Sequence, residues 1–380
     1  MKENTDSLLQ RIVEPEHGEF FYSFVNAEGK RWLLSAKSRR TAISIYQPGS
    51  CKGRMLLGFF PYLFQLPFIG LSGCLKSIRL SLDPVLQDLL EKTYSCTSPD
   101  FSIFCGTPSA NPKITIQISK GKKVLGYCKL TDKPEIAELF FHEQGVLDEL
   151  LNAGIGRIPE CLYCGKLNND IWAFAQSSDR TEEAVVSHRF TTYHRDFLEE
   201  LYFSTKRCFL WEETDFAQSL EDLGEYTNHF LSEDRILIWD AVRTVERFYR
   251  ADHVEFSMYH GDFTPWNTFV AGGKLYAFDF EYACRSCPPY MDACHFISET
   301  ARLELKMDPV KAFRFFCWSM KRSLPEVKDP GYLYLGYLLY TLSFYFRLYN
   351  GRFDTDDKGY AYWVGLIRII TDKTNGNKTK

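Results

Sequence analysis

The chain has 380 residues, of which 45% are hydrophobic, 25% are charged and 16% are aromatic. This composition excludes an intrinsically disordered chain and is typical of a folded protein long enough for two domains. The formal net charge of −4 lacks the basic surplus of a nucleic-acid-binding surface, so we expect no nucleic-acid partner. Residues 1–16 are polar and charged, without the apolar core of a signal peptide, and we expect a cytoplasmic location with reduced cysteines.

Residues 1–83 are predicted to form an N-terminal extension, to which the sequence assigns no role. Within it, residues 55–75 carry no charged side chain and follow a basic stretch at 30–54. Three interpretations stay open: packed structure inside the folded protein, peripheral contact with an anionic membrane, and a membrane span. Pro61 and Pro67 count against a continuous helix in lipid, because each proline removes a backbone hydrogen bond.

Residues 84–178 are predicted to form a small antiparallel sheet of five strands with one helix. Short runs of β-branched and aromatic residues, separated by turn residues, indicate the strands. These runs lie at 101–107, 113–119, 124–130, 160–167 and 170–176. Apolar residues recur at helical spacing over 135–152, and Gly154 and Gly156 then end the pattern.

Residues 179–371 are predicted to be mainly helical, and residues 372–380 to be a disordered tail. Apolar residues at helical spacing indicate the helices. They lie at 233–250, 308–324, 333–349 and 358–370. The sequence thus predicts an α+β protein with a strand-rich first lobe and a helical second lobe.

Residues 258–283, MYHGDFTPWNTFVAGGKLYAFDFEYA, combine a predicted hairpin with a set of oxygen-bearing side chains. The apolar runs TFV and LYAF are joined by the turn AGGK. Asp262 and Asn267 lie before the first strand, and Asp279 and Glu281 follow the second, so pairing of the strands is expected to bring all four to one edge. Carboxylate and amide oxygens are the ligands that magnesium prefers. Phosphoryl transfer uses such metal ligands together with a separate carboxylate that orients the attacking hydroxyl.

HGDFTPWN followed by DFE resembles the aminoglycoside phosphotransferase and choline kinase group, relatives of the protein kinases. The resemblance implies a two-lobed protein-kinase-like fold. It also implies that Asp262 is the catalytic base and that Asn267 and Asp279 hold magnesium. Glu281 would reach a second metal ion, directly or through water.

The same resemblance implies residues that support the site. His260 would brace the catalytic loop against the DFE turn. The stretch PPYMDACHF is similar to a family segment whose buried aspartate, here Asp292, steadies that loop. The kinase plan also needs a strand lysine that contacts the α- and β-phosphates and a helix glutamate that positions it. Lys129 and Glu143 occupy those places in chain order, and Glu138 is the rival partner for the lysine.

The loop CGTPSANP departs from the family pattern, because it holds one glycine where protein kinases have G-x-G-x-x-G. Gly106, Ser109 and Ala110 are small enough for backbone N–H groups to approach a phosphate of ATP or GTP. We therefore expect nucleotide binding over a weak phosphate loop.

The expected reaction is magnesium-dependent transfer of a phosphoryl group from ATP or GTP to a hydroxyl of a small molecule, sugar or glycan. The alternative is a pseudokinase, a nucleotide-binding or scaffolding module without turnover. A protein kinase is disfavoured, because no activation segment ending near A-P-E separates Glu281 from Asp292. A four-thiolate zinc site from two CxxC pairs, Cys161/Cys164 and Cys284/Cys287, is a further alternative.

Overall fold

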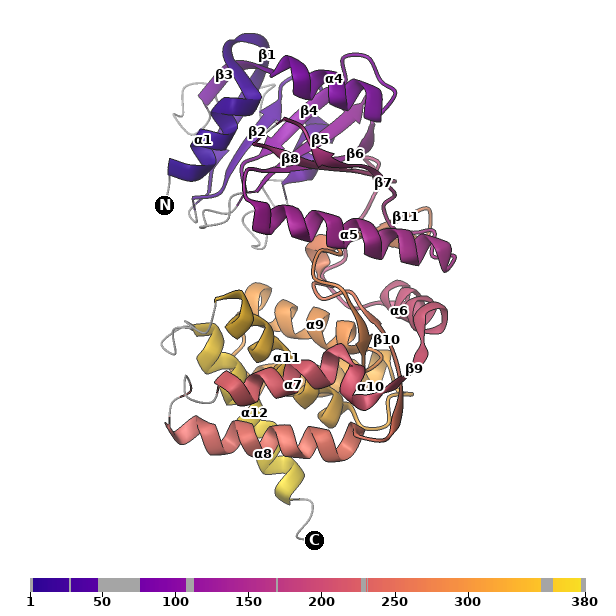
Figure 1. The fold of residues 1–380 in the computed structure, drawn as a ribbon. Helices are drawn as coiled ribbons and strands as arrows, with labels where there is room; N and C mark the ends of the chain where they lie inside the picture. The colour runs from indigo at the N-terminus through magenta and orange to yellow at the C-terminus, as the bar shows by residue number, and fades with distance from the viewer. Residues whose placement is uncertain are drawn as a thin grey trace. The chain divides into compact units, whose positions relative to one another are not determined.

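The computed structural model describes residues 3–26, 29–46, 76–106, 113–168, 170–226, 230, 232–349 and 358–376 (Figure 1). The chain divides into two compact units, and each is described by itself. The N-terminal unit comprises Met1–Asn152, Gly156–Val186 and Phe269–Glu281. The C-terminal unit comprises Ala153–Ile155, Ser187–Thr268 and Tyr282–Lys380.

In the described part of the N-terminal unit, eight antiparallel strands form one sheet in the order β3-β1-β2-β4-β5-β6-β8-β7 (Figure 1). The strands are β1 (Val13–Val25), β2 (Arg31–Ser35), β3 (Lys76–Leu82), β4 (Asp100–Phe104), β5 (Ile114–Lys120), β6 (Lys123–Thr131), β7 (Cys161–Lys166) and β8 (Trp172–Ser177). The helices are α1 (Glu3–Ile12), α2 (Arg39–Ala42), α4 (Pro84–Thr93) and α5 (Pro134–Asn152), with a 3-10 turn at Ile43–Ile45. A separate hairpin pairs β11 (Thr268–Ala271) with β12 (Lys274–Ala277).

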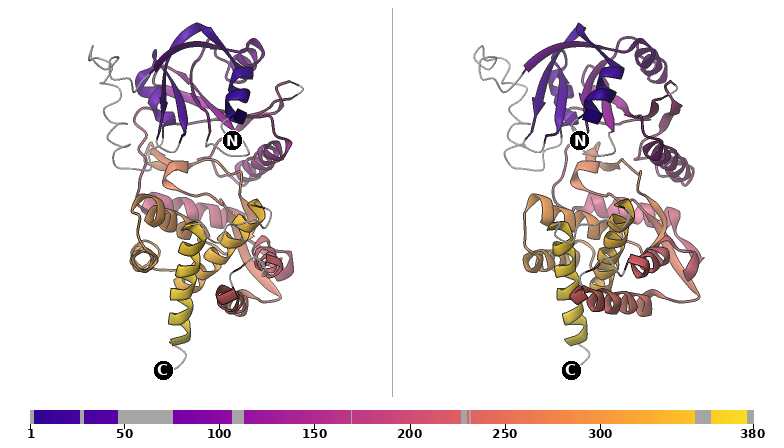
Figure 2. Two further views of the ribbon diagram at one scale, coloured as in Figure 1. Left: turned by 90° about the vertical axis from the view of Figure 1, so that its left-hand side faces the viewer. Right: turned by 60° about the vertical axis from the view of Figure 1, so that its left-hand side comes forward.

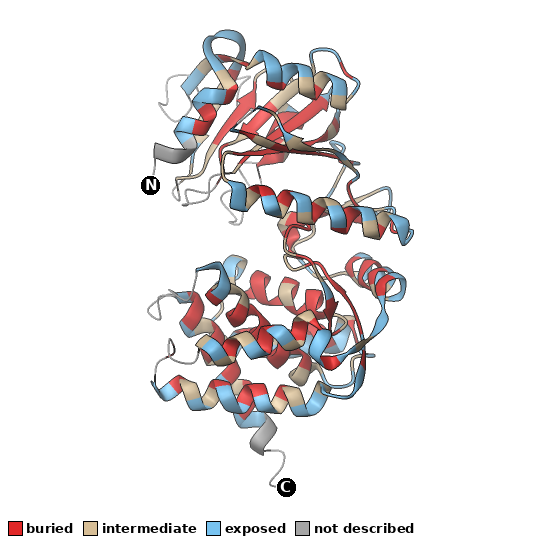
Figure 3. Cartoon of the chain, viewed as in Figure 1, coloured by how far each residue is buried: buried red, intermediate tan, exposed pale blue. Residues whose placement is uncertain are grey.

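The alternation of side chains along the strands gives this sheet two apolar faces. Leu33 on β2 packs in a cluster with Leu8 of α1 and Leu86 of α4. Its neighbours Trp32 and Leu34 point to the opposite face, in a second cluster that includes residues of α2 and the 3-10 turn. Figure 3 shows that the central strands are largely buried. Burial on both faces makes the central strands a rigid base for side chains at their ends.

The predicted separation of residues 1–83 as an extension is wrong, because they build part of the sheet. β1 pairs with β2 and β3, and β2 pairs with β4, so three strands continue the sheet beyond the predicted five. Figure 2 shows these strands beside α1 from two further sides. Phe21 and Leu80 join the same apolar cluster as Ile103, which gives the physical reason for the addition. The segment 55–75 lies outside the described residues, and no helix of the described chain is long and apolar enough to cross a membrane.

The C-terminal unit is mainly helical, as the sequence predicts. Its helices are α6 (Thr192–Thr205), α7 (Asp215–Glu225), α8 (Ser232–Tyr249), α9 (Met291–Glu299), α10 (Pro309–Ser323), α11 (Pro330–Leu348) and α12 (Lys358–Gly376). Shorter turns lie at Trp211–Glu213, Pro265–Asn267 and Thr300–Glu304. The strands β9 (Arg207–Leu210), β10 (His253–Tyr259) and β13 (Cys284–Cys287) pair in the order β13-β10-β9.

α11 is the central helix of the C-terminal unit. It carries no charged residue before Arg347, and most of its side chains are buried. It contacts α7, α8, α9 and α12, as expected for a helix that is apolar on all sides. α12 continues through Gly376, past the predicted start of the tail at residue 372, and residues 377–380 lie outside the described chain.

The third residue of α6 is the buried His194, at the position where a capping box usually has Glu or Gln. His194 Nδ1 accepts a hydrogen bond from the backbone N–H of Thr191 at 3.1 Å, and it lies 2.8 Å from the Thr191 hydroxyl. The imidazole packs against the rings of Phe190, Phe263 and Phe296. Because burial disfavours the imidazolium, it lowers the pKa of His194 to about 3.

The lowered pKa of His194 predicts a loss of stability in mild acid. The unfolded chain binds a proton at this histidine near pH 6.5 and the folded chain does not, so stability is lost as the pH falls below that value. Between pH 7.5 and pH 5 this group alone should lower the free energy of unfolding by about 2 kcal/mol. Urea unfolding of the wild type and of His194→Gln at both pH values measures the difference.

The control for this prediction is the exposed His253, whose replacement by Gln should retain the wild-type pH dependence. An equal fall in the free energy of unfolding for His194→Gln and the wild type would contradict the prediction.

Candidate active site

The predicted hairpin is present and is held by the N-terminal unit. Gly272 and Gly273 form the turn with φ of +56° and +72°, the left-handed conformation that a tight hairpin turn requires. The Arg157 guanidinium donates hydrogen bonds to the carbonyls of Ala271 and Lys274. Arg157 therefore fixes both sides of the turn, and Asp279 follows the second strand after one intervening residue.

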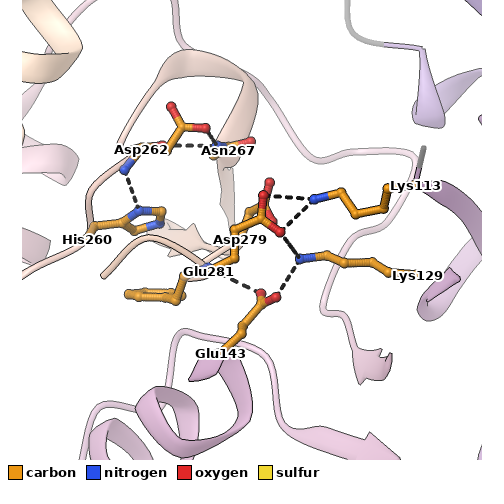
Figure 4. A network of polar contacts seen from close by, with 9 residues as sticks. Lys113, Lys129, Glu143, His260, Asp262, Asn267, Asp279 and Glu281 are labelled. Carbon is orange, nitrogen blue, oxygen red and sulfur yellow. Dashed lines mark hydrogen bonds and ion pairs between the residues drawn. The ribbon is translucent and has the colours of Figure 1, made fainter. Parts of the chain in front are cut away.

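The predicted lysine and glutamate of the N-terminal unit are in contact (Figure 4). The Lys129 side chain on β6 is 6% exposed, and its Nζ lies 2.6 Å from Glu143 Oε2 and 2.5 Å from Asp279 Oδ1. Glu143 on α5 is fully buried, and its other oxygen accepts a hydrogen bond from the backbone N–H of Phe280 at 3.2 Å. Glu143 thus holds both the lysine and the DFE segment, whereas the rival Glu138 is exposed.

Lys113 is a functional candidate that the sequence analysis missed. It lies directly before β5, and its Nζ is 2.8 Å and 2.6 Å from the two carboxylate oxygens of Glu281 (Figure 4). A signal was present, since Lys113 follows the loop that was expected to approach a phosphate. Gly106 begins that loop with φ +79°, and a Cβ there would lie 2.2 Å from the Lys113 carbonyl oxygen. Ser109 and Ala110 lie outside the described residues.

Three carboxylates of the N-terminal unit are spaced as metal ligands. One oxygen each from Glu143, Asp279 and Glu281 lies within 4.8 Å of the others. Hard carboxylate oxygens at this spacing fit a divalent cation such as Mg²⁺. Burial and the two neighbouring carboxylates raise the pKa of Glu143, against the opposing effect of Lys129. Burial alone would lower the pKa of Lys129, but the surrounding carboxylates raise it, so the lysine is a cation.

The backbone of Asp279 has φ +72°, which is uncommon for a residue other than glycine. Such a conformation persists only where neighbouring contacts hold it, and it is frequent at functional sites. Here Lys129 binds the Asp279 carboxylate and Glu143 binds the next N–H in the chain. Two contacts, one from the sheet and one from α5, therefore hold this strained backbone conformation in place.

The loop after β10 carries the predicted base in the C-terminal unit. The Asp262 N–H donates to His260 Nδ1 at 3.3 Å, and Asn267 Nδ2 donates to Asp262 Oδ2 at 2.7 Å (Figure 4). Since the Asn267 amide nitrogen is engaged by Asp262, its oxygen is the atom that can bind a metal. Gly261 has φ +85°, and a Cβ there would lie 2.2 Å from the carbonyl oxygen of Tyr282. The Asp262 carboxylate is 32% exposed and can reach a substrate.

Asp292 contacts the same loop from the first turn of α9. Its Oδ2 accepts a hydrogen bond from the backbone N–H of His260 at 3.0 Å, and burial raises the pKa of Asp292 to about 7. This contact is the kind expected of a residue that steadies the loop. Two predictions join residues of different units and stay predictions. The first is that Asp262 and Asn267 act together with Asp279 and Glu281. The second is that His260 braces the DFE segment.

The two CxxC pairs lie in different units, Cys161/Cys164 on β7 and Cys284/Cys287 on β13. Within each unit, the residues that the structure describes place no third metal ligand beside either pair. The zinc alternative therefore gains no support from the fold.

Comparison with known proteins finds similar solved structures. No family model matches the sequence, and no curated protein does. The structure is similar to the apo form of a thermostable mutant of aminoglycoside phosphotransferase APH(4)-Ia, with a TM-score of 0.53, 12% identity, and coverage of 76% of this chain and 99% of that chain. A ternary complex of a mutant of the same enzyme with AMP-PNP and hygromycin B has a TM-score of 0.52 and 13% identity, covering 76% of this chain and 98% of that one. The chain therefore has the kinase-like fold of the aminoglycoside phosphotransferases, as the sequence predicts.

Proposed function

We propose that the protein is a phosphotransferase that transfers a phosphoryl group from ATP or GTP to a hydroxyl of a small molecule, sugar or glycan. The observation that carries this proposal is the contact of the buried Lys129 with the buried Glu143 and with Asp279, in which a lysine is held between a helix glutamate and the DFE aspartate. The fold shared with APH(4)-Ia, a phosphotransferase studied with AMP-PNP and hygromycin B, supports the same reaction class.

The N-terminal unit supplies the nucleotide-binding groups in this proposal. Lys129 binds the α- and β-phosphates, and Glu143 keeps its ammonium in place. Lys113 adds a second cation that can exchange its Glu281 partner for a phosphate oxygen. Asp279 and Glu281, with Asn267 of the C-terminal unit, are the proposed magnesium ligands. When bound, the metal ion neutralises the charge that develops on the phosphate oxygens.

Asp262 is the proposed base. Its carboxylate would accept a hydrogen bond from the acceptor hydroxyl and orient the oxygen for attack. It would take the proton as the new O–P bond forms and the bond from the γ-phosphorus to the departing nucleoside diphosphate breaks. His260 and Asn267 hold the loop that carries it. In this reaction class most of the rate enhancement comes from positioning and charge neutralisation, so residues that hold the loop contribute to the rate together with the carboxylate.

Release of nucleoside diphosphate tests the function. We expect Mg²⁺-dependent release of ADP or GDP that rises above the no-acceptor rate with at least one class among sugars, lipid-linked glycans, aminoglycosides and amino alcohols. Nucleotide binding without any acceptor-dependent release would favour the pseudokinase alternative. Absence of nucleotide binding would refute the phosphotransferase and leave only a scaffolding module without nucleotide. The cytoplasmic location and the membrane contact of residues 55–75 stay predictions beside this proposal.

A further inference from the structure

Both oxygens of the Asp262 carboxylate have a side-chain partner within the C-terminal unit. Asn267 Nδ2 lies 2.7 Å from Oδ2, and His295 Nε2 lies 3.2 Å from Oδ1. His295 is on α9, three residues after Asp292, which binds the backbone of the same loop. One helix therefore holds the loop twice, at its backbone and at the carboxylate.

The imidazole of His295, on α9, lies between the end of β10 and α11. The side chain is 14% exposed. Its Nδ1 lies 3.5 Å from the Tyr259 hydroxyl at the end of β10 and 3.4 Å from the Tyr337 hydroxyl on α11. The ring of Tyr337 meets the imidazole edge to face, with centroids 5.7 Å apart. These contacts leave the ring little freedom to rotate away from Asp262.

The surroundings also determine which nitrogen carries hydrogen. An ionised Asp262 carboxylate can only accept a hydrogen bond, so its contact with His295 requires hydrogen on Nε2, and in the neutral ring either tyrosine hydroxyl can then donate to Nδ1. Burial alone would lower the pKa of His295, but the hydrogen bond to Asp262 and the charges of Asp262, Glu299 and Asp292 raise it. In the protonated ring both nitrogens carry hydrogen. An N–H therefore faces Asp262 in either protonation state.

We propose that His295 is a positioning residue whose Nε2–H fixes the rotamer of the Asp262 carboxylate. This inference rests on the proposed function, in which Asp262 is the base. The carboxylate of an aspartate can rotate about χ2 over a broad range of angles, and the hydrogen bond from Asn267 restrains only one of its oxygens. With His295 on the other oxygen, the carboxylate plane is set before the acceptor hydroxyl arrives, which is the preorganisation that a general base needs.

Paired substitutions at residue 295 separate positioning from packing. His295→Leu keeps bulk and removes the donor, whereas His295→Gln keeps an N–H at a similar distance from the backbone. We expect His295→Leu to lower kcat by about 10- to 100-fold with an unchanged nucleotide Kd, and His295→Gln to recover kcat to within about threefold of the wild type. Equal losses in the two variants, accompanied by equal falls in Tm, would overturn the proposal in favour of a packing role.

A spectroscopic measurement tests the donor without any turnover. In protein labelled with ¹⁵N-histidine, the resonances of His295 are assigned by their loss in His295→Gln. We expect either the imidazolium or the neutral tautomer with hydrogen on Nε2. A neutral ring with hydrogen on Nδ1 would overturn the proposal, because that ring cannot donate to Asp262.

A double-variant cycle distinguishes failure of this inference from failure of the proposed function. If His295 acts through Asp262, His295→Leu should lower the residual rate of Asp262→Asn by less than about twofold. A full additional loss in the double variant would overturn the positioning role alone. Wild-type turnover in Asp262→Asn would overturn the role of Asp262 as base and this inference with it.

Discussion

Asp262→Asn is expected to lower kcat by about 10²- to 10⁴-fold, the usual contribution of a general base, while nucleotide affinity stays within about twofold of the wild type. Asparagine preserves the size of the side chain and an oxygen that can accept the hydrogen bond from His295 or Asn267. What it lacks is the charge and basicity needed to orient the acceptor hydroxyl and take its proton. The measurement is steady-state release of nucleoside diphosphate, beside calorimetric titration with AMP-PNP and Mg²⁺.

A matched control for this variant is Asp252→Asn. Asp252 is an exposed aspartate in the same unit, before β10, and its replacement should leave kcat unchanged. A decrease confined to nucleotide affinity in Asp262→Asn would place this carboxylate in binding rather than in proton transfer. Comparable kcat values for Asp262→Asn and the wild type would remove it as the base.

Asp279→Asn is expected to lower turnover by about 10²- to 10³-fold and to weaken binding of the magnesium–nucleotide complex by roughly 10- to 100-fold. The substitution removes one of three carboxylates whose oxygens lie within 4.8 Å of one another. Asparagine tolerates the left-handed backbone at this position, so the local fold should survive. Thermal-shift measurements with AMP-PNP, with and without Mg²⁺, report the loss without requiring turnover.

The control for Asp279→Asn is Glu138→Gln, an exposed carboxylate on α5 that lies outside the carboxylate cluster. It should show the full magnesium-dependent shift of the wild type. A shift in Asp279→Asn that is as large as in the control would exclude Asp279 as a ligand of the metal.

Local sequence patterns were sufficient to predict elements that form between residues close together in the chain. The hairpin β11–β12 follows from two apolar runs around a double-glycine turn, and α5 follows from apolar residues at helical spacing. The kinase plan placed Lys129 on a strand and its partner on the next helix, with Glu143 and Glu138 as candidates, and the structure brings Lys129 into contact with Glu143. The hairpin and the helix form from short stretches whose local preferences agree with the final fold.

Long-range packing decided the features that the sequence did not reveal. The strands β1 and β2 contain the apolar and aromatic runs FFYSFV and RWLLS, but these runs do not specify which strands they pair with. They join the main sheet because Phe21 and Leu33 complete an apolar cluster with residues of β4 to β6. Lys113 gains a partner 168 positions away in Glu281. The contact of His295 with Asp262 depends on how α9 packs beside the end of β10.

From the amino-acid sequence by itself, local periodicity predicted an α+β protein, and the resemblance of its short motifs to a known family implied the kinase-like fold, the expected site residues and the reaction class to test. Only the tertiary structure decided that residues 1–83 contribute strands to the main sheet, that Glu143 and not Glu138 holds Lys129, and that His295 lies behind the expected base. The physical reason is that a contact between distant residues depends on the packing of whole elements, and no local pattern in the chain encodes that packing.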